Sequence, residues 1–240
     1  HYFIVYNQKL KSLFSLQSPD WRIATINQVN DDNTTTFLRK VGSVIWSFDI
    51  FENQVVFKDI DNQLKSFDID SPNKLTTIYK NPLKRIAYPE VSGNSNKIAI
   101  VSGSVFKNSI HAYDLKTGKS EKVFASETLL RFPQQVGGEL LFMSEETGIR
   151  QIYAYKEGTK TQITNFNRNR NIIKFALSNN KKWLAISFSD STTVYARNDN
   201  GLTELKSFGL KSQPAFSANS ERILLANWVS SNASDASGIE

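Results

Sequence analysis

Residues 98–124, with the sequence IAIVSGSVFKNSIHAYDLKTGKSEKVF, decide the fold of this chain. A short apolar run (98–102) is followed by an alternating segment (109–115), a turn (116–119) and a second alternating segment (120–124). Short runs rich in Val, Ile, Phe and Tyr, separated by Gly, Asn, Asp and Ser clusters, are typical of strands and turns. The glycine in the turn supplies the positive φ that a tight hairpin needs. This segment therefore predicts consecutive antiparallel strands.

The same pattern recurs along the whole chain. The third residue of each apolar run falls at Phe14, Phe57, Ile100, Phe142, Ile186 and Leu225. The intervals between these positions are 43, 43, 42, 44 and 39 residues. A nearly constant period of this length indicates a repeat of four strands. One four-stranded sheet cannot bury both of its faces, so such repeats pack radially as the blades of a propeller.

The sequence thus predicts an all-β β-propeller that forms one domain over residues 1–240. Its blades span residues 2–42, 43–84, 85–128, 129–170, 171–210 and 211–240. Each complete blade has strands A to D in chain order, whereas the sixth supplies only A and B. We therefore expect a six-bladed ring of which this chain is a fragment. A closed ring of five blades with an extra hairpin is the alternative.

The composition excludes several kinds of protein. The 240 residues include no cysteine, which excludes disulfide frameworks, thiolate nucleophiles and cysteine-bound metals. A hydrophobic content of 40% is enough for a sizeable core. No apolar run reaches the roughly 18 residues of a membrane helix, so any membrane attachment needs a segment outside this chain.

Catalytic motifs are missing from the sequence. Of the two histidines, His1 is terminal and His111 lies in an alternating strand, so no Ser-His-Asp arrangement can be assembled. There is no Gly-x-Ser-x-Gly elbow, no Gly-rich phosphate loop and no His-Glu-x-x-His motif. We expect His111 to be an ordinary, partly buried strand residue and the protein not to be an enzyme.

Two pairs of aspartates are the only candidates for a metal site. Asp59 and Asp61 lie in one short loop, and Asp68 and Asp70 follow the next strand. Calcium prefers such oxygen ligands, but a calcium loop also needs a glycine at its sharp turn and a distal bidentate glutamate. Both are missing, so we expect solvated turn carboxylates, no metal and no cofactor.

Positive charge is concentrated in the middle of the chain. The formal net charge is +6; residues 71–210 hold 20 basic and 11 acidic side chains, whereas residues 1–70 hold 7 and 9. In a propeller the D-to-A and B-to-C connections share one face, where ligands commonly enter. The candidate binding residues on this face are Lys84, Arg85, Lys107, Arg168 and Arg170, with Phe106 and Phe166 as apolar contacts.

Clustered arginines bind carboxylates through paired hydrogen bonds. We therefore expect this face to bind a protein partner with an acidic surface or a small anionic ligand. Nucleic acid is not expected, because Glu145, Glu146, Asp59 and Asp61 lie in other loops of the same face.

Several segments resemble the TolB-like propeller family. Blades of that family read Ser-Pro-Asp-Gly, two residues, Ile-Ala-Phe, and then Ile-Tyr-x-x-Asp-x-x-x-Gly. The matching segments here are SGNSNKIAI (92–100) with IHAYDLKTG (110–118), SNNKKWLAI (178–186) and SANSERIL (217–224). The Ser-Pro-Asp-Gly turn is not intact in any of them, and Asn usually replaces its Asp. WD-type repeats fit less well, since no Gly-His or Trp-Asp landmarks occur in register.

The resemblance implies a function as well as a fold. It implies a non-catalytic domain that binds a protein or ligand, such as the extracytoplasmic sensory part of a membrane-anchored winged-helix regulator resembling CadC, located in the periplasm or elsewhere outside the cytoplasm. The alternative is the substrate-gating propeller of a prolyl-oligopeptidase-like serine peptidase whose catalytic domain is absent from this chain. A third interpretation is a purely structural interaction module.

Overall fold

The computed structural model describes most of the chain. The described residues are 2–7, 10, 12–17, 23–30, 32, 34–42, 48–59, 61, 63–80, 85–91, 97–103, 107–198, 201–217 and 219–227. Every regular element among them is a β-strand, and none of them forms a helix that is long and apolar enough to cross a membrane.

The strands form six sheets of consecutive strands. The first two sheets are β1 (Tyr2–Asn7), β2 (Ser12–Gln17), β3 (Ile23–Val29), β4 (Thr35–Gly42), and β5 (Phe48–Phe51), β6 (Gln54–Lys58), β7 (Gln63–Asp68), β8 (Ser71–Lys80). The next two are β9 (Arg85–Val91), β10 (Lys97–Gly103), β11 (Asn108–Asp114), β12 (Ser120–Ser126), and β13 (Leu130–Val136), β14 (Glu139–Ser144), β15 (Gln151–Lys156), β16 (Thr159–Gln162). The last two are β17 (Lys174–Leu177), β18 (Trp183–Ser187), β19 (Thr192–Asn198), β20 (Gly201–Phe208), and β21 (Ser212–Phe216), β22 (Ile223–Asn227).

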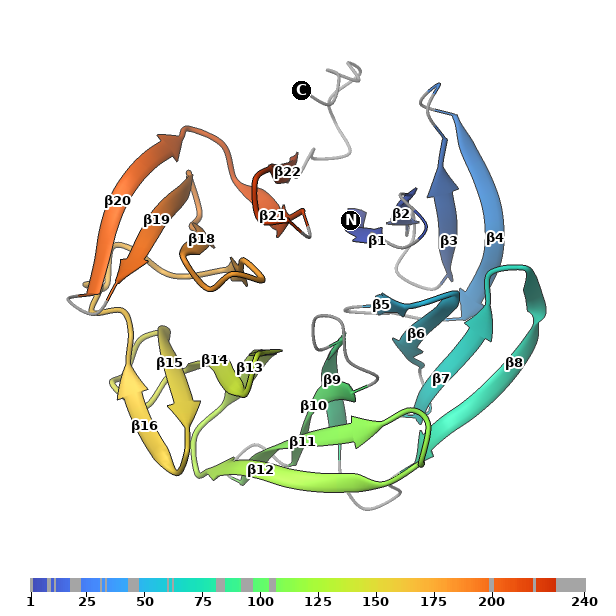
Figure 1. The fold of residues 1–240 in the computed structure, drawn as a ribbon, viewed down its shortest axis with the longest axis horizontal. Helices are drawn as coiled ribbons and strands as arrows, with labels where there is room; N and C mark the ends of the chain where they lie inside the picture. The colour runs from blue at the N-terminus through green and yellow to red at the C-terminus, as the bar shows by residue number, and fades with distance from the viewer. Residues whose placement is uncertain are drawn as a thin grey trace.

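These sheets are arranged in a ring, which confirms the predicted all-β propeller (Figure 1). The first strand of each sheet lies next to the centre, and the fourth strand of each complete sheet lies on the outer rim. Five sheets have four strands each and pair in the order of the chain, as the repeat length predicts. The sixth is partial: β21 contacts β17 and β18 on one side and β1 on the other, so it occupies a place in the ring.

The middle strands bury both of their faces between neighbouring blades. In β10, Ile98 belongs to an apolar cluster with Val56 of the second sheet, whereas the next residue, Ala99, belongs to a cluster with Phe142 of the fourth. Each of these four side chains is at most 1% exposed. Successive strand residues point to opposite faces, so a continuous apolar run is what a strand covered on both sides requires.

Other pairs of neighbouring blades share clusters in the same way. Phe14 of the first sheet packs with Phe57 of the second, and Met143 of the fourth packs with Ile186 of the fifth. The core is therefore divided among the interfaces between blades.

Polar side chains add links between the fourth and fifth blades. Gln134 in β13 donates from Nε2 to the carbonyl of Phe175 (3.3 Å) and accepts at Oε1 from the amide of Leu177 (2.9 Å), so its side chain bonds to the innermost strand of the next blade. At the start of β14, Glu139 forms a bidentate ion pair with Arg197 of β19. Arg197 donates from Nη1 to Oε2 (2.9 Å) and from Nη2 to Oε1 of Glu139.

Turn-forming residues in the sequence predict hairpin turns at Glu157-Gly158 and over residues 70–73, and the structure confirms the first but not the second. Glu157 and Gly158 form a two-residue turn with φ of 50° and 83°, which joins β15 to β16. Backbone of this kind suits the right-handed twist of the flanking strands.

The second of these is the turn after β7, which the sequence predicts at residues 70–73. The turn lies at Ile69 and Asp70, and Ser71 already belongs to β8, where it pairs with Asp68. Asp68 itself is the reason: its Oδ1 accepts a hydrogen bond from the Asp70 amide (2.9 Å), and Asn53 donates to both carboxylates. A side-chain bond to the backbone two residues on makes a tighter turn than the Ser-Pro-Asn sequence alone suggests.

The ion pair between Glu139 and Arg197 gives a prediction for stability. Hydrogen bonds from Arg197 hold the pKa of Glu139 below its ordinary value, against the opposing effect of burial. Glu139→Gln should lower the free energy of unfolding by about 1–3 kcal/mol, because a largely buried guanidinium then lacks its counter-charge. Chemical denaturation at neutral pH measures this loss.

The pH dependence provides the control. A depressed carboxyl pKa contributes stability that is complete above the ordinary value and disappears as the pH falls through the folded-state value. Between about pH 5 and about pH 3 the unchanged protein should therefore lose more stability than Glu139→Gln does. Glu157→Gln is the matched control, since Glu157 is exposed and should shift stability by less than about 0.5 kcal/mol. Equal pH profiles for Glu139→Gln and the unchanged protein would contradict the assignment.

Candidate functional site: the loop face of blades four and five

One face of the ring carries the second-to-third-strand turns and the connections from each blade to the next. We call it the loop face. Because consecutive strands are antiparallel, both kinds of connection lie on the same side of every blade. The contact of Arg170, in the connection after β16, with Phe188, in the turn after β18, shows this directly.

Buried polar residues hold these connections in place. In three successive blades the first residue of the third strand donates from its side chain to a backbone carbonyl of the connection: Asn108 to Thr128 (3.1 Å), Gln151 to Phe166 (2.8 Å) and Thr192 to Leu210 (3.0 Å). The three donors are 8%, 1% and 0% exposed. A buried hydrogen bond to a connection that lacks a sheet partner satisfies its backbone and fixes its path.

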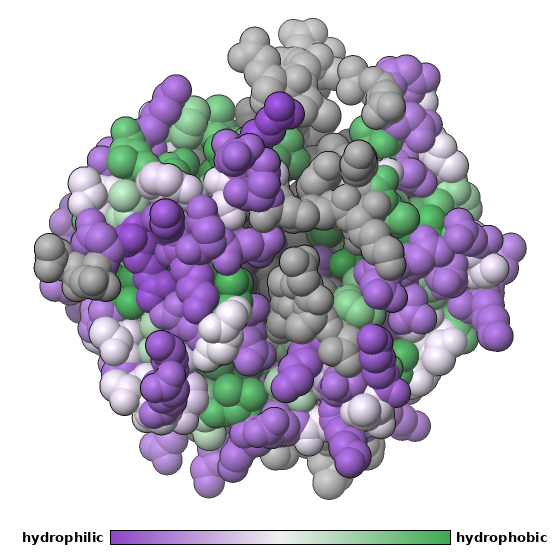
Figure 2. Space-filling view, in the orientation of Figure 1, coloured by the Kyte–Doolittle hydropathy of each residue, from purple (hydrophilic) through white to green (hydrophobic). Residues whose placement is uncertain are grey.

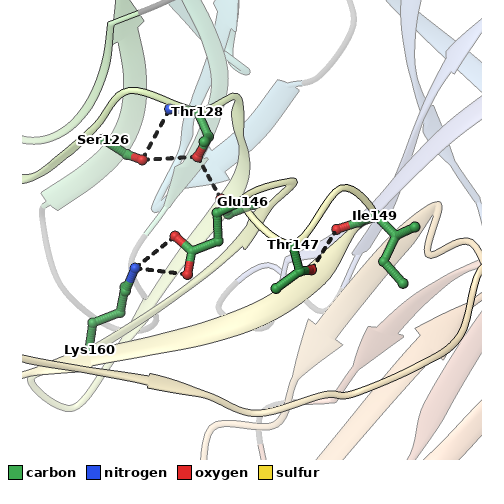
Figure 3. A network of polar contacts seen from close by, with 7 residues as sticks. Ser126, Thr128, Glu146, Thr147, Ile149 and Lys160 are labelled. Carbon is green, nitrogen blue, oxygen red and sulfur yellow. Dashed lines mark hydrogen bonds and ion pairs between the residues drawn. The ribbon is translucent and has the colours of Figure 1, made fainter.

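The fourth blade has the most extensive arrangement of this kind. Gln151 Oε1 also accepts from Thr164 Oγ1 (2.7 Å) and from the amide of Phe166 (3.1 Å). Figure 3 shows the neighbouring network, in which Ser126 and Thr128 are hydrogen-bonded and Lys160 reaches both carboxylate oxygens of Glu146 at 2.8 and 2.7 Å. The loop face over blades four and five is therefore a rigid surface.

Sequence reasoning missed these anchoring residues, although a signal for them exists. Asn108, Gln151 and Thr192 are spaced by 43 and 41 residues, in step with the repeat, and each directly precedes the alternating segment of a third strand. A polar residue at one fixed position of a repeat indicates a structural hydrogen bond there.

Thr192→Val tests the anchoring role. Thr192 Oγ1 bonds to the carbonyl of Leu210 and also lies 2.8 Å from Ser212 Oγ, so the isosteric valine leaves buried polar groups without partners. We expect a loss of about 1–3 kcal/mol in the free energy of unfolding, measured by denaturant titration. Thr161→Val, at an exposed position of β16, should change stability by less than about 0.5 kcal/mol. A similar effect of the two substitutions would refute the role.

Arginines gather on the loop face of blades four and five. The chain has nine arginines, and four of them, Arg131, Arg150, Arg168 and Arg170, lie at or beside this sector's connections. We call these four residues the arginine sector. Arginine rather than lysine is the side chain suited to paired hydrogen bonds with carboxylates.

Two members of the sector are engaged by one glutamate. Arg150 Nε lies 3.1 Å and Arg131 Nε 3.6 Å from Glu145 Oε1, and Arg150 also donates to the carbonyl of Ile172 (3.3 Å). These two arginines were not predicted from the sequence, because they are isolated residues 19 positions apart and only the fold brings them to one carboxylate.

The other two members are the predicted residues Arg168 and Arg170, and they differ from each other. Arg168 is exposed. Arg170 is half-buried, with its guanidinium carbon 5.5 Å from the ring centre of Phe166 and 4.4 Å from that of Phe188. Phe166 is thus a packing partner of Arg170 as well as an apolar residue of the rim.

Of the remaining predicted site residues, the structure describes the side chain of Lys107. Lys107 is exposed at the turn before β11, in the third blade. Arg85 begins β9, where only the backbone is described, and Lys84 and Phe106 lie outside the described residues. The structure therefore places Arg168 and Arg170 in one connection and Lys107 in another blade.

The aromatic surroundings of Arg170 include Tyr195 of β19. Burial raises the pKa of the Tyr195 hydroxyl, and the positive charge of Arg170 opposes this effect. The centres of the Phe166 and Tyr195 rings are 6.2 Å apart. Arg170 is therefore set in an apolar, partly water-excluded environment, in which its interaction with an anion would be stronger than at an open surface.

The prediction that the turn aspartates are solvated is wrong for Asp59. Asp59 is 5% exposed, forms an ion pair with Lys65 and accepts at Oδ1 from the amide of Gln63 (2.9 Å). It stabilises the turn between β6 and β7. Asp61 is exposed, and the described part of the chain holds no cluster of three or more residues suited to a metal ion.

His111 lies in β11 and is half-buried, as the alternation predicts. Its Nε2 is 2.9 Å from Ser109 Oγ, and its Nδ1 is 3.4 Å from Ser120 Oγ. Ser109 is only 8% exposed and also donates to the carbonyl of Ser102 (3.0 Å). The Ser109 hydroxyl is therefore engaged within its own sheet.

The face of the ring shown in Figure 2 is mostly hydrophilic. Its hydrophobic residues form separate small areas rather than one continuous patch. A partner that docked on this face would meet mainly polar and charged side chains, and surfaces of that kind depend on electrostatic complementarity.

Comparison by sequence finds no relatives: no family model matches the chain, and no curated protein resembles it. Comparison by structure finds many. Oligogalacturonate lyase from Vibrio parahaemolyticus is similar with a TM-score of 0.68 at 11% identity, over 92% of this chain and 68% of the lyase. TolB from Acinetobacter baumannii has a TM-score of 0.67 at 16% identity, over 93% of this chain and 57% of TolB.

A prolyl endopeptidase is also similar, with a TM-score of 0.57 at 8% identity, over 85% of this chain and 35% of the peptidase. Identities this low show the fold alone. The chain has a TolB-like β-propeller fold, and proteins that share it include TolB as well as enzymes.

Proposed function

We propose that this propeller is a non-catalytic recognition domain that binds an acidic protein surface on the loop face of blades four and five. The observation that carries the proposal is the arginine sector on rigidly held connections. Four arginines share this surface, and Glu145 engages only Arg131 and Arg150. Four positive charges against one leave a surplus, to which Arg168 and Arg170 contribute most.

The mechanism of recognition follows from this arrangement. The buried bonds of Gln151 and Thr192 fix the connections before a partner arrives, so little conformational entropy is lost on binding. Exposed Arg168 supplies attraction at a distance and raises the rate of encounter. Arg170, whose guanidinium is held against Phe166 and Phe188, supplies a contact of fixed orientation with a carboxylate of the partner.

The biological setting proposed for this domain is sensing outside the cytoplasm. A TolB-like propeller suits the extracytoplasmic part of a membrane-anchored winged-helix regulator, with its membrane segment outside this chain. The TolB-like fold is consistent with this setting, since the sequence resemblance to that family implies a binding domain.

We also propose that the ring is six-bladed. Among the described strands β22 pairs with β21 alone, and its Leu224 and Leu225 are only half-buried. In the fifth blade the corresponding residues, Ala185 and Ile186, are 0% exposed because a third and a fourth strand and the neighbouring blades cover them. Two further strands on β22 would give the sixth sheet the same cover.

The second candidate function is a propeller that filters substrates for a serine peptidase domain. The likeness to a prolyl endopeptidase favours it, since this chain matches 35% of that enzyme. The two functions differ in what the natural protein contains. Hydrolysis of a fluorogenic peptide by the full-length protein, with labelling by a serine-directed fluorophosphonate, would establish the peptidase and exclude the recognition domain proposed first.

Arg168→Glu tests the leading proposal. Partner proteins from an extract of the source organism are captured on the immobilised full-length protein and quantified by mass spectrometry over a range of salt concentrations. Reversal of an exposed charge at the binding surface should reduce capture of acidic partners by about tenfold at low salt. The same capture should weaken in the unchanged protein as salt rises.

Lys182→Glu is the matched control, because Lys182 is exposed between β17 and β18, on the opposite face of the fifth blade. It should change capture by less than about twofold. If the two charge reversals reduce partner capture equally, the partners respond to the net charge of the whole domain, and the loop face is not the binding surface.

A further inference from the structure

Arg170 is the one half-buried arginine of the sector that has no counter-charge among the described residues. Arg131 and Arg150 share Glu145, and Arg168 is exposed to solvent. Arg170 is half-buried, yet within the described residues no carboxylate forms an ion pair with it. Its guanidinium donates one long hydrogen bond, 3.4 Å from Nη2 to Thr193 Oγ1, and also lies beside the Tyr195 hydroxyl. A charge withdrawn from water without a counter-charge is costly, so we expect an anionic group of a ligand to supply the counter-charge here.

The aromatic neighbours determine which part of Arg170 is available. Phe166 and Phe188 lie within 5.5 Å of the guanidinium carbon and themselves meet at 84° with centres 5.2 Å apart. They occupy the apolar surface around the planar group and restrain its orientation. The five N–H donors of a guanidinium lie in its plane, so stacking on rings leaves its hydrogen-bonding edge available.

A carboxylate is the anion that suits such an edge. Two parallel N–H bonds from one guanidinium match the two oxygens of a planar carboxylate. Because Arg170 is half-buried, a singly charged carboxylate, which keeps a smaller hydration shell than a doubly charged phosphate, loses less solvation on binding there. Arg168, two residues earlier and exposed, is placed to meet a second negative charge of the same ligand.

We propose that Arg170 anchors a carboxylate group of the ligand, with its guanidinium held in place by Phe166, Phe188 and Thr193. This inference rests on the proposed function, since it names the chemical group through which an acidic partner is held. It predicts that the contact is specific for carboxylates and that Arg170, rather than the more exposed Arg168, contributes most of the affinity.

The test uses a fluorescein-labelled hexaglutamate peptide as the probe and fluorescence anisotropy as the measurement, with the full-length protein at low salt. Arg170→Lys keeps the positive charge but loses the flat two-pronged donor, and should weaken binding by about tenfold or more. Arg168→Ala should weaken it by about threefold or less. Glutarate should displace the peptide at lower concentrations than inorganic phosphate does.

A second measurement keeps the proposal testable if Arg170→Lys does not fold. In the unchanged protein, the side-chain Nε–H signal of Arg170 should shift in nitrogen–proton NMR spectra as glutarate is added, whereas the signal of Arg197, on the opposite face, should not. A shift of the Arg170 signal supports the carboxylate contact, and an unchanged signal at saturating peptide overturns it.

The remaining outcomes separate this inference from the proposed function. If phosphate displaces the peptide as well as glutarate does, or if Arg168→Ala weakens binding more than Arg170→Lys, the carboxylate contact is overturned while acidic partners can still depend on the loop face. If Arg168→Glu leaves partner capture unchanged although glutarate still shifts the Arg170 signal, the proposed function fails and the carboxylate contact remains.

Discussion

The burial of both faces of the middle strands is the constraint on which this structure depends. Ile98 needs the second sheet to cover it and Ala99 needs the fourth, so the third sheet has no stable form without both neighbours. Burying a side chain such as that of Ile98 stabilises the fold by about 1.5–3 kcal/mol. The clusters that neighbouring blades share contain several side chains of similar size. The ring arrangement is the geometric solution that gives every such face a partner.

This division of the core explains where polar residues are tolerated. Apolar side chains occupy the interfaces between blades, so the two faces of the ring consist of connections and turns. On the loop face the connections are held by Asn108, Gln151 and Thr192, which come from the strands themselves. The arginine sector is built on segments whose positions the core determines. A regular repeat can therefore carry a binding surface that is confined to two of its blades.

Much of the fold could be predicted from the sequence because strand periodicity and repeat length are local signals. The spacing of the apolar runs specifies four strands per blade, and Gly118 and Gly158 mark their hairpins. The turn after β7 was misplaced because it depends on the side chain of Asp68, which outweighs the turn preference of Pro72.

The site was predicted only in part. Arg168 and Arg170 stand out as a cluster in the sequence, whereas Arg131 and Arg150 become neighbours only when β13 and β15 are brought to Glu145. The burial of Asp59 depends in the same way on Lys65, whose approach no local pattern indicates. Contacts between side chains from different strands require the register of the sheet, and residue spacing alone does not supply it.

The alternating burial of the middle strands has a consequence for how this chain can evolve. Two residues adjacent in sequence, such as Leu141 and Phe142, belong to different interfaces, the first shared with the fifth blade and the second with the third. A change of volume at one of them calls for compensation in the following blade, and a change at the other calls for it in the preceding blade. Covariation between homologues should therefore connect each middle strand to both of its neighbouring blades, with odd and even positions coupled in opposite directions around the ring.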